Sequence, residues 1–436
     1  MRVHGNHGVA VIGGGQAGLA MSYCLDRRGI DHLVIEKHRV GHDWREQRWD
    51  SFCLVTPNWQ CDLPGFPYAG DDPHGFMAKH EIVAYLEAYA RSFGPPLVEG
   101  VTVTALRRRG RGFALTTTGG DCTADRVVLA VGGYHRPAMP RMAERLPPGI
   151  VSIHSARYRR PDQLPPGAVL VVGTGQSGCQ IAEDLHLAGR RVHLAVGSAP
   201  RTARRYRGKD VVEWLDAMGH YRMPVGEHPL GDRIRDRTNH YVTGRDGGHD
   251  IDLRQFALEG MQLHGRLVDI QAGRAELADD LAVQLDNADA VAENIKDSID
   301  RYIAASGIGA PAESRYRPVW RPVSGSPLLD LHVDRRLDLA AAGISAVVWC
   351  TGFRSDWSWV DVPIFDGRGY PSNTRGVTAA DGLYVLGLPW LHTWGSGRFS
   401  GVGADAEYIA EHIAEHIAEH IAEAAVARQP AARATG

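Results

Sequence analysis

VIGGGQAG (Val11–Gly18) joins a short apolar run to a helix-forming stretch, and it predicts a strand–turn–helix unit that binds a dinucleotide. The first glycine of this G-x-G-x-x-G pattern allows a sharp turn, the second lets the backbone approach a pyrophosphate, and the third lets the helix pack closely on the strand. The helix N-terminus offers unpaired N–H groups and a partial positive charge to phosphates. The residues expected at the cofactor are Gly13, Gly15, Gln16, Ala17 and Gly18.

A second apolar run, HLVIEK (His32–Lys37), follows the predicted helix and reads as the next strand of the same unit. We expect Glu36, at its end, to accept hydrogen bonds from a ribose diol, with Lys37 beside the same nucleotide. A carboxylate repels a 2′-phosphate, so this first site suits FAD or NAD and disfavours NADP.

VVGTGQSG (Val171–Gly178) repeats the arrangement, and the strand after it ends without an acid. Ser198 and several arginines stand there instead, and such groups suit a 2′-phosphate because the guanidinium fork matches phosphate oxygens. The second site therefore favours NADPH. Two alternatives remain for the arginines: a solvated basic loop, or a site that receives a carboxylate-bearing substrate. The residues expected at NADPH are Gly173, Gly175, Gln176, Ser177, Gly178, Ser198, Arg201 and Arg204.

Composition and charge are those of an ordinary soluble protein, with 436 residues, 44% hydrophobic residues and a net charge of −3. We expect no nucleic-acid partner, no membrane association and a cytoplasmic location, because there is no basic excess, no signal-peptide pattern and no membrane-spanning run. The six cysteines are scattered and form no C-x-x-C pair, so neither a disulfide framework nor a metal site is expected.

The segment Val40–Tyr68 resembles the flavin-containing monooxygenases and their plant relatives that act on indole-3-pyruvate. Trp44 and Arg45 match a G-x-x-W-R element, and the resemblance implies that both lie near FAD. His154 and Tyr158 match only part of the family fingerprint. Thr351 and Gly352 belong to a match of the A-T-G-[FY] turn, which implies contact with the cofactors.

The fold class expected from the two glycine turns is α/β, with two Rossmann-like dinucleotide-binding domains. The resemblance implies that the NADPH domain (153–350) is inserted in a discontinuous FAD domain (1–152 and 351–436, with the C-terminal helix and tail). Residues 206–318 depart from the family pattern, and we expect them to shape the substrate side and a lid.

The resemblance also implies a chemistry, in which NADPH reduces FAD and the reduced flavin forms a C4a-(hydro)peroxide with O₂. The terminal oxygen would pass to a soft heteroatom of a small molecule, an amine nitrogen or a thioether sulfur. N-hydroxylation of an amino acid or another carboxylate-bearing amine is one expectation. Asn58 and Arg398 are the candidate catalytic residues, because their segments are expected beside the flavin ring. A homodimer is left open.

Four alternative functions remain. Oxidative decarboxylation of a 2-oxo acid and Baeyer–Villiger oxygenation would use the same flavin. A disulfide reductase would need a close cysteine pair, and Cys53 and Cys61 are the nearest candidates. A redox-sensing flavoprotein without turnover is the fourth.

The C-terminal stretch repeats isoleucine and histidine every four residues. We expect a helix that packs its isoleucines on the FAD domain. His412, His416 and His420 have the spacing of metal ligands on a helix, but the sequence nearby supplies no further ligand.

Overall fold

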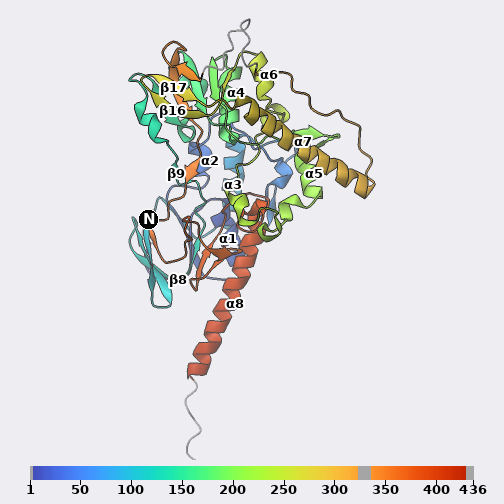
Figure 1. Cartoon of the computed structure of the whole chain (residues 1–436). Helices are drawn as coiled ribbons and strands as arrows, with labels where there is room; N and C mark the ends of the chain where they lie inside the picture. Colours follow the sequence, from blue (N-terminus) through green and yellow to red (C-terminus); the bar gives the residue numbers. More distant parts are fainter. Residues whose placement is uncertain (1–2, 323–334, 429–436) are drawn as a thin grey trace, which may run out of the picture.

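The computed structural model describes residues 3–322 and 335–428, with side chains through residue 423. Two sheets form the centres of the molecule (Figure 1). The main path of the larger sheet is β21 (Val360–Asp361), β6 (Val103–Arg109), β7 (Gly112–Thr117), β8 (Cys122–Leu129), β1 (Asn6–Ile12), β2 (His32–Glu36) and β5 (Leu97–Glu99). Further strands branch from β8: β24 (Leu383–Val385), β23 (Val377–Thr378) and β22 (Asn373–Thr374).

The second sheet has five strands, and all its pairs are parallel. Parallel strands need crossover connections, which place helices on the sheet faces and bury the strands. Its order is β10 (Val151–His154), β19 (Ile344–Trp349), β11 (Ala168–Val172), β12 (Val192–Ala195) and β15 (Gln262–His264). Together with the parallel β5–β2–β1–β8 core of the larger sheet, this arrangement confirms the predicted α/β class with two Rossmann-like units.

Along the chain, β10 is the first strand of the second sheet and β19 is its last. The predicted domain boundaries, after residues 152 and 350, therefore fall within β10 and directly after β19. Two connections between the sheets are held together, because β9 (Arg136–Pro137) pairs antiparallel with β20 (Phe353–Arg354). The tail assigned to the FAD domain, 429–436, lies outside the described residues.

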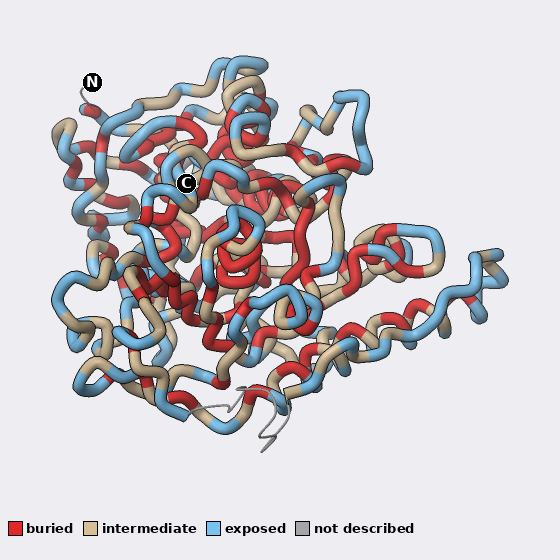
Figure 2. Tube along the Cα trace, turned by 90° about the horizontal axis from the view of Figure 1, so that it is seen from above, coloured by how far each residue is buried: buried red, intermediate tan, exposed pale blue. Residues whose placement is uncertain are grey.

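Helices cover both sheets and fix the glycine turns at their edges. On the larger sheet, α1 (Gln16–Asp26) packs against α8 (Val402–Arg428) and α3 (Lys79–Phe93), and their buried apolar residues belong to one cluster. Figure 2 shows the buried residues gathered towards the centre of the molecule. On the second sheet α4 (Gln176–Leu187) follows β11 directly. The remaining helices are α2 (His42–Glu46), α5 (Val211–Ala217), α6 (Leu253–Leu258) and α7 (Leu281–Ser306).

The predicted isoleucine packing of α8 is confirmed along its first turns. Ile409 and Ile413 are fully buried against the larger sheet, whereas Ile421 is 65% exposed. A repeat of four residues drifts around a helix of 3.6 residues per turn, so the stripe leaves the core. In Figure 1 the end of α8 runs outward from the body. Among the described residues, no helix is both long and apolar enough to cross a membrane.

Candidate functional site: two dinucleotide cradles

The first glycine turn has the close contacts that its sequence predicts. A Cβ on Gly13 would lie 2.5 Å from the Ala130 carbonyl oxygen, and Gly13 has a φ of +106°. A Cβ on Gly18 would lie 1.7 Å from the Gly13 oxygen, so α1 can approach the strand only with glycine there. Around Gly15 a Cβ would meet no described atom within 4 Å, which leaves the backbone open to a phosphate.

Glu36 lies at the end of β2, directly beside this turn. Its carboxylate accepts hydrogen bonds from the N–H of Gly14 (2.6 Å) and of His38 (2.8 Å), and the side chain is 9% exposed. These bonds fix the carboxylate at the edge where a nucleotide on the α1 N-terminus would place its ribose. The residues present therefore fit the adenosine end of FAD. Lys37 follows on the surface.

The second turn has the same geometry. Gly173 has a φ of +98° and Gly178 would bring a Cβ 1.9 Å from the Gly173 oxygen. Gly175 is again open, because a Cβ there would meet only the Thr238 methyl group within 4 Å. Both glycine turns thus present the N-terminus of a helix, α1 or α4, to a pyrophosphate.

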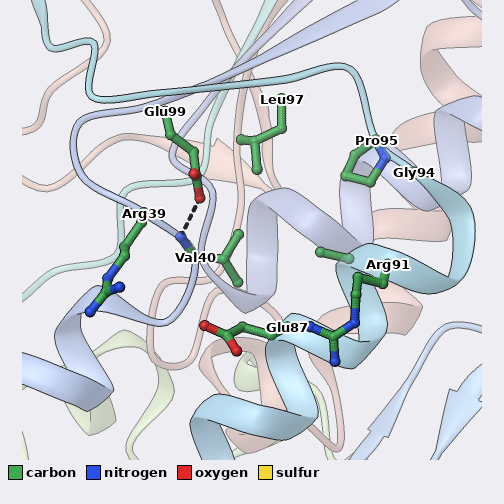
Figure 3. A pocket seen from close by; sticks show the side chains of 9 residues that line it. Arg39, Val40, Glu87, Arg91, Gly94, Pro95, Leu97 and Glu99 are labelled. Carbon is green, nitrogen blue, oxygen red and sulfur yellow. Dashed lines mark hydrogen bonds between the residues drawn. The ribbon is translucent and has the colours of Figure 1, made fainter.

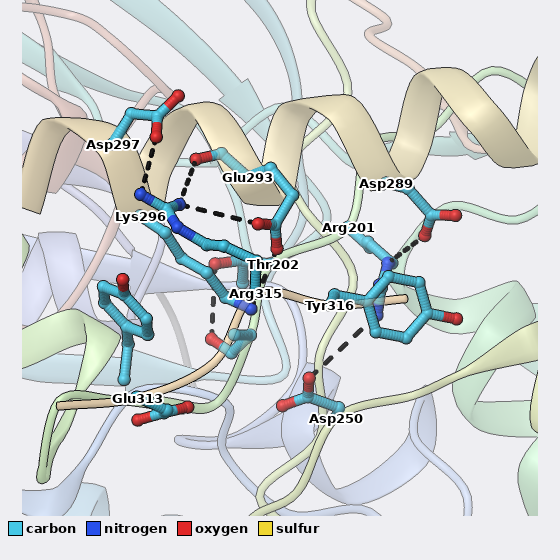
Figure 4. Close-up of polar contacts among 12 residues, drawn as sticks. Arg201, Thr202, Asp250, Asp289, Glu293, Lys296, Asp297, Glu313, Arg315 and Tyr316 are labelled. Carbon is cyan, nitrogen blue, oxygen red and sulfur yellow. Dashed lines mark hydrogen bonds and ion pairs between the residues drawn. The ribbon is translucent and has the colours of Figure 1, made fainter. Parts of the chain in front are cut away.

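Arg201 does not take the predicted role at the 2′-phosphate. Its side chain is 3% exposed, Nε donates to Asp289 on α7 (2.6 Å), and the guanidinium lies 4.0 Å from the centre of the Tyr316 ring (Figure 4). A guanidinium satisfied in this way by a carboxylate and an aromatic face has no free edge for a phosphate. Arg201 instead fastens α7 to the second sheet.

The predicted contact of Arg204 with the 2′-phosphate is replaced by a structural role for the same reason, because its guanidinium is also buried and bonded within the protein. It is 2% exposed and donates to Asp210 (2.5 Å) and to the Val55 carbonyl (2.7 Å). Val55 belongs to the FAD-binding segment, so Arg204 joins the two halves of the protein. Ser198 remains exposed after β12, and it is the predicted 2′-phosphate residue that stays available.

Asn58 has a structural role in place of the predicted catalytic one. It is 4% exposed, its amide donates to the Asp72 carbonyl (2.9 Å), and its oxygen accepts from the Met77 N–H (2.7 Å). Both ends of the amide therefore hold the 72–77 loop, and the side chain does not present a free group to a flavin.

Trp44 and Arg45 occupy one short helix, α2, beside the start of α8. Trp44 stacks on Phe399, with ring centroids 5.8 Å apart, and the guanidinium of Arg48 lies 5.3 Å from its ring. Arg45 forms an ion pair with Glu87 on α3 (2.6 Å). The sequence motifs did not indicate Arg48. It carries no ion pair among the described residues, and burial lowers its pKa.

Arg398 lies just before α8, where its segment reaches the first turn. Gln16 at the start of α1 donates to the Gly397 carbonyl (3.0 Å), which ties residues 397 and 398 to the predicted pyrophosphate site. The Arg398 guanidinium lies 3.6 Å from the centre of the Trp394 ring and donates to Asn239 (3.0 Å). The structure thus brings Arg398 and the inserted domain together.

The A-T-G-[FY] turn joins the two connections between the sheets. Thr351 donates to the Ala138 carbonyl (2.6 Å), and the Gly352 carbonyl is hydrogen-bonded to His154 Nε2 (2.8 Å). Burial lowers the pKa of His154, which keeps this imidazole neutral. Thr351 and Gly352 therefore stabilise the two connections between the sheets. Their contact with the cofactors stays a prediction.

Cys53 and Cys61 are both buried free thiols. Burial raises the pKa of Cys53 to about 11 and that of Cys61 to about 12. Thiol–disulfide exchange needs an accessible thiolate, usually stabilised by a lowered pKa. These two cysteines therefore lack the environment of a redox pair.

A pocket of about 430 Å³ lies behind the ribose end of the first site (Figure 3). Leu97 and Glu99 on β5 line this pocket, and Glu99 accepts a hydrogen bond from the Val40 N–H (2.8 Å). None of its lining residues belongs to the 394–398 segment, so we assign this pocket no part in the chemistry.

The histidines of α8 meet an acid that the sequence did not reveal. Asp381, His416 and His420 bring ligand atoms within 4.8 Å of one another. However, Arg126 donates to Nδ1 of His416 (3.2 Å) and of His420 (3.3 Å). Because the positively charged guanidinium of Arg126 already donates to both rings, we assign no metal to this cluster.

Two nucleotide cradles, one with an acidic ribose end and one without, define a flavin-dependent oxidoreductase of the two-dinucleotide-domain class. A family model described as pyridine nucleotide-disulphide oxidoreductase matches residues 10–248, and the chain belongs to this family. The family implies FAD and NAD(P)H as cofactors.

The comparisons with known proteins agree with this class. The chain is 33% identical, over 92% of its length and 96% of the relative, to "Uncharacterized oxidoreductase CzcO-like" of Geobacillus kaustophilus. It is 30% identical to indole-3-pyruvate monooxygenase YUCCA1 of Oryza sativa, over 43% of this chain and 47% of that protein. The predicted resemblance is thus confirmed.

Two solved structures share the fold. The flavin-containing monooxygenase from Stenotrophomonas maltophilia has a TM-score of 0.63 at 18% identity, covering 96% of this chain and all of that one. Bacillithiol disulfide reductase from Staphylococcus aureus has a TM-score of 0.58 at 14% identity, covering 95% and 98%. Both reactions therefore occur on this architecture, and the site has to decide between them.

Proposed function

We propose that the protein is an FAD- and NADPH-dependent monooxygenase that oxygenates a soft heteroatom of a small molecule, an amine nitrogen or a thioether sulfur. One observation supports this choice over disulfide reduction: the cysteines nearest the flavin segment, Cys53 and Cys61, are buried thiols with raised pKa values. The names of the S. maltophilia and O. sativa proteins point in the same direction.

Flavin and nicotinamide supply the redox chemistry when bound, and the chain positions and shields them. Glu36 and the α1 N-terminus hold the FAD nucleotide, and the α4 N-terminus holds the NADPH pyrophosphate. Ser198, in place of an acid, accepts the 2′-phosphate without charge repulsion. Trp44 and Phe399 form an apolar wall beside α1, which helps to exclude water from the ring.

The test follows the reoxidation of the reduced, NADP⁺-bound protein after rapid mixing with oxygen. A monooxygenase is expected to reoxidise in two resolved steps, seen by flavin absorbance, with the second step accelerated by substrate. The Cys53→Ala/Cys61→Ala double variant should behave in the same way. Single-step reoxidation with stoichiometric H₂O₂, or loss of NADPH-driven turnover in the double variant, would contradict the proposal.

Decarboxylation of a 2-oxo acid is the second candidate, favoured by the partial similarity to the indole-3-pyruvate monooxygenase. Release of CO₂ in step with NADPH consumption would identify it, whereas ¹⁸O from ¹⁸O₂ in a hydroxylamine or sulfoxide would identify heteroatom oxygenation.

A further inference from the structure

A strap from the inserted domain, residues 219–240, covers the segment 389–398 that leads into α8. The Val225 N–H donates to the His392 carbonyl (2.6 Å), and Arg235 donates to the Trp390 carbonyl (3.0 Å). The rings of Tyr221 and Trp394 lie 4.3 Å apart. The strap therefore packs directly on the segment that is expected beside the flavin ring, and it belongs to the region (206–318) from which a lid is expected.

The covered segment carries backbone strain. Trp390 has a φ of +54°, a conformation that costs a bulky residue free energy. Two contacts hold Trp390 in this conformation. Arg235 donates to the Trp390 carbonyl, and the indole ring lies edge-to-face with the His228 ring, with centroids 5.2 Å apart. Strain of this kind persists where the surrounding structure fixes a functional geometry.

Arg398 lies under this cover with no acid beside it. Its guanidinium has five N–H donors, and two of its nitrogens are bonded, Nη1 to the Trp394 carbonyl and Nη2 to Asn239 (3.0 Å). No carboxylate lies within ion-pair distance among the described residues. Its titratable neighbours are the phenols of Tyr134 and Tyr221 and the imidazole of His220, and burial lowers the pKa of Arg398 to about 10.

Arg398 is half-buried, and a cation partly removed from water without an accompanying anion is costly. Trp394, on which the guanidinium lies, fixes its plane, and the remaining N–H edge matches the two oxygens of a carboxylate. The two pyrophosphates have their own cradles at α1 and α4. Two aromatic side chains beside Arg398, Tyr221 and Trp394, offer apolar and aromatic surface.

We propose that Arg398 anchors the carboxylate of an aromatic or apolar substrate that lies beside the strap and the 389–398 segment. This inference rests on the proposed function, because it names the substrate class of the same site. Arg201, Arg204 and Arg207 are committed to ion pairs, whereas Arg398 has no acidic partner among the described residues, so the carboxylate site is assigned to Arg398. Tyr134 is 55% exposed and lies near both Arg398 and Arg48, so the substrate would reach Arg398 from the side of Tyr134.

The test measures binding to the oxidised, flavin-loaded protein by calorimetry, without turnover. The probes are 3-phenylpropanoate and its neutral isostere 3-phenylpropanamide. We expect the carboxylate to bind about tenfold more tightly or better, because it gains a charge-assisted bidentate contact. Arg398→Met should abolish this preference, and Arg398→Lys should retain part of it. Asn239→Asp should also abolish it by supplying an internal carboxylate.

Arg237→Met is the matched control, since Arg237 is an exposed arginine of the same strap. It should leave both affinities unchanged. Equal binding of the two probes, no binding of the carboxylate, or a preference that survives Arg398→Met would overturn the inference. A loss of NADP⁺ affinity in Arg398→Met as large as the loss for the carboxylate would also overturn it, because the anion would then be a cofactor phosphate. Two-step reoxidation of the parent protein is measured separately, so failure of either proposal can be distinguished.

Discussion

At the scale of single residues, the two cradles depend on atoms that leave no room for a side chain. Gly18 and Gly178 each place a hypothetical Cβ within 2 Å of a carbonyl oxygen, that of Gly13 or Gly173. Real Cβ atoms do not approach oxygen so closely, so any substitution has to push the helix away from its strand. The N–H groups that meet the pyrophosphate would move with it.

Glu36→Gln should weaken FAD binding. The change removes the negative charge that accepts two backbone N–H bonds and faces the ribose, and charged hydrogen bonds contribute about 1.5–3 kcal/mol. We expect FAD affinity to fall roughly tenfold to a hundredfold. Titration of the apoprotein with FAD measures it. The control is Glu99→Gln on the neighbouring strand, the register partner of Glu36; an equal loss there would refute the specific role of Glu36.

Ser198→Asp should reverse part of the nucleotide preference. An exposed carboxylate at the end of β12 would repel a 2′-phosphate and accept bonds from a ribose diol. The ratio of kcat/KM for NADPH to that for NADH should fall by about tenfold, which corresponds to about 1.4 kcal/mol. Ser198→Ala should change the ratio much less. An unchanged ratio in Ser198→Asp would show that the 2′-phosphate is bound elsewhere.

At the scale of elements, α8 shows how a short repeat divides into a core part and a free part. Its first isoleucines complete the cluster between α1 and the larger sheet, and its histidines contact Tyr384 on β24 and Asp381 just before that strand. Packing therefore stabilises the N-terminal half of this helix, close to the predicted flavin site.

Ile413→Ala and Ile421→Ala make a matched pair on this helix. Ile413 is fully buried, so its truncation should lower the free energy of unfolding by about 2–5 kcal/mol. Ile421 is 65% exposed, and its truncation should change that free energy by no more than about 0.5 kcal/mol. Urea denaturation measures both. Similar effects of the two substitutions would contradict the observed packing.

A pair of partly buried histidines links strands β12 and β15 and should make unfolding pH-dependent. His193 Nδ1 and His264 Nε2 lie 2.9 Å apart, and burial lowers the pKa of His193 to about 4 and that of His264 to about 3. The unfolded chain, with an ordinary pKa near 6.5, binds protons that the folded chain does not. Stability should therefore fall as the pH drops from about 6.5 towards 4, and be independent of this pair above that range.

The measurement is the free energy of unfolding in urea at a series of pH values. Each histidine contributes a slope of up to about 1.4 kcal/mol per pH unit between its two pKa values. His264→Gln removes one titrating ring, so its slope should be smaller than that of the parent protein. A flat profile in the parent between pH 6.5 and 5 would show that the rings are not held neutral.

At the scale of the whole molecule, the relative position of the two sheets is fixed by close packing between them. A Cβ on Gly244 would lie 2.0 Å from the Leu54 carbonyl oxygen and 2.6 Å from the Phe76 ring. Arg204 spans the same interface, and Asp184 on α4 accepts from Ser51 (2.6 Å). These contacts hold the two sheets in one relative arrangement, which the proposed transfer of a hydride from NADPH to the flavin requires.

Gly244→Ala should disturb that geometry without strain in its own backbone, because Gly244 has a φ of −96°. We expect an unchanged content of bound FAD, and a rate of flavin reduction by NADPH that falls roughly tenfold to a hundredfold. Stopped-flow absorbance measures it. Gly226→Ala is the control, since a Cβ there meets nothing within 4 Å. Normal reduction in Gly244→Ala would mean that the interface tolerates movement.

The sequence by itself determined the parts of this protein that depend on local backbone geometry. Glycine spacing and the acid at residue 36 are set by contacts within one strand–turn–helix unit, so they could be predicted, together with the two-domain α/β class. The isoleucine stripe of α8 was predictable for the same reason, because helical periodicity is local.

Only the tertiary structure decided which charged side chains are free. Arg201, Arg204 and Arg398 are alike in sequence, but Asp289 and Asp210 pair with the first two and no described acid pairs with the third. Both ends of the Asn58 amide are likewise bonded to the loop folded over it. The fold also brings Asp381 next to the histidines of α8. Such partners come from distant segments, and their positions follow from the packing of whole elements, which spacing along the chain does not encode.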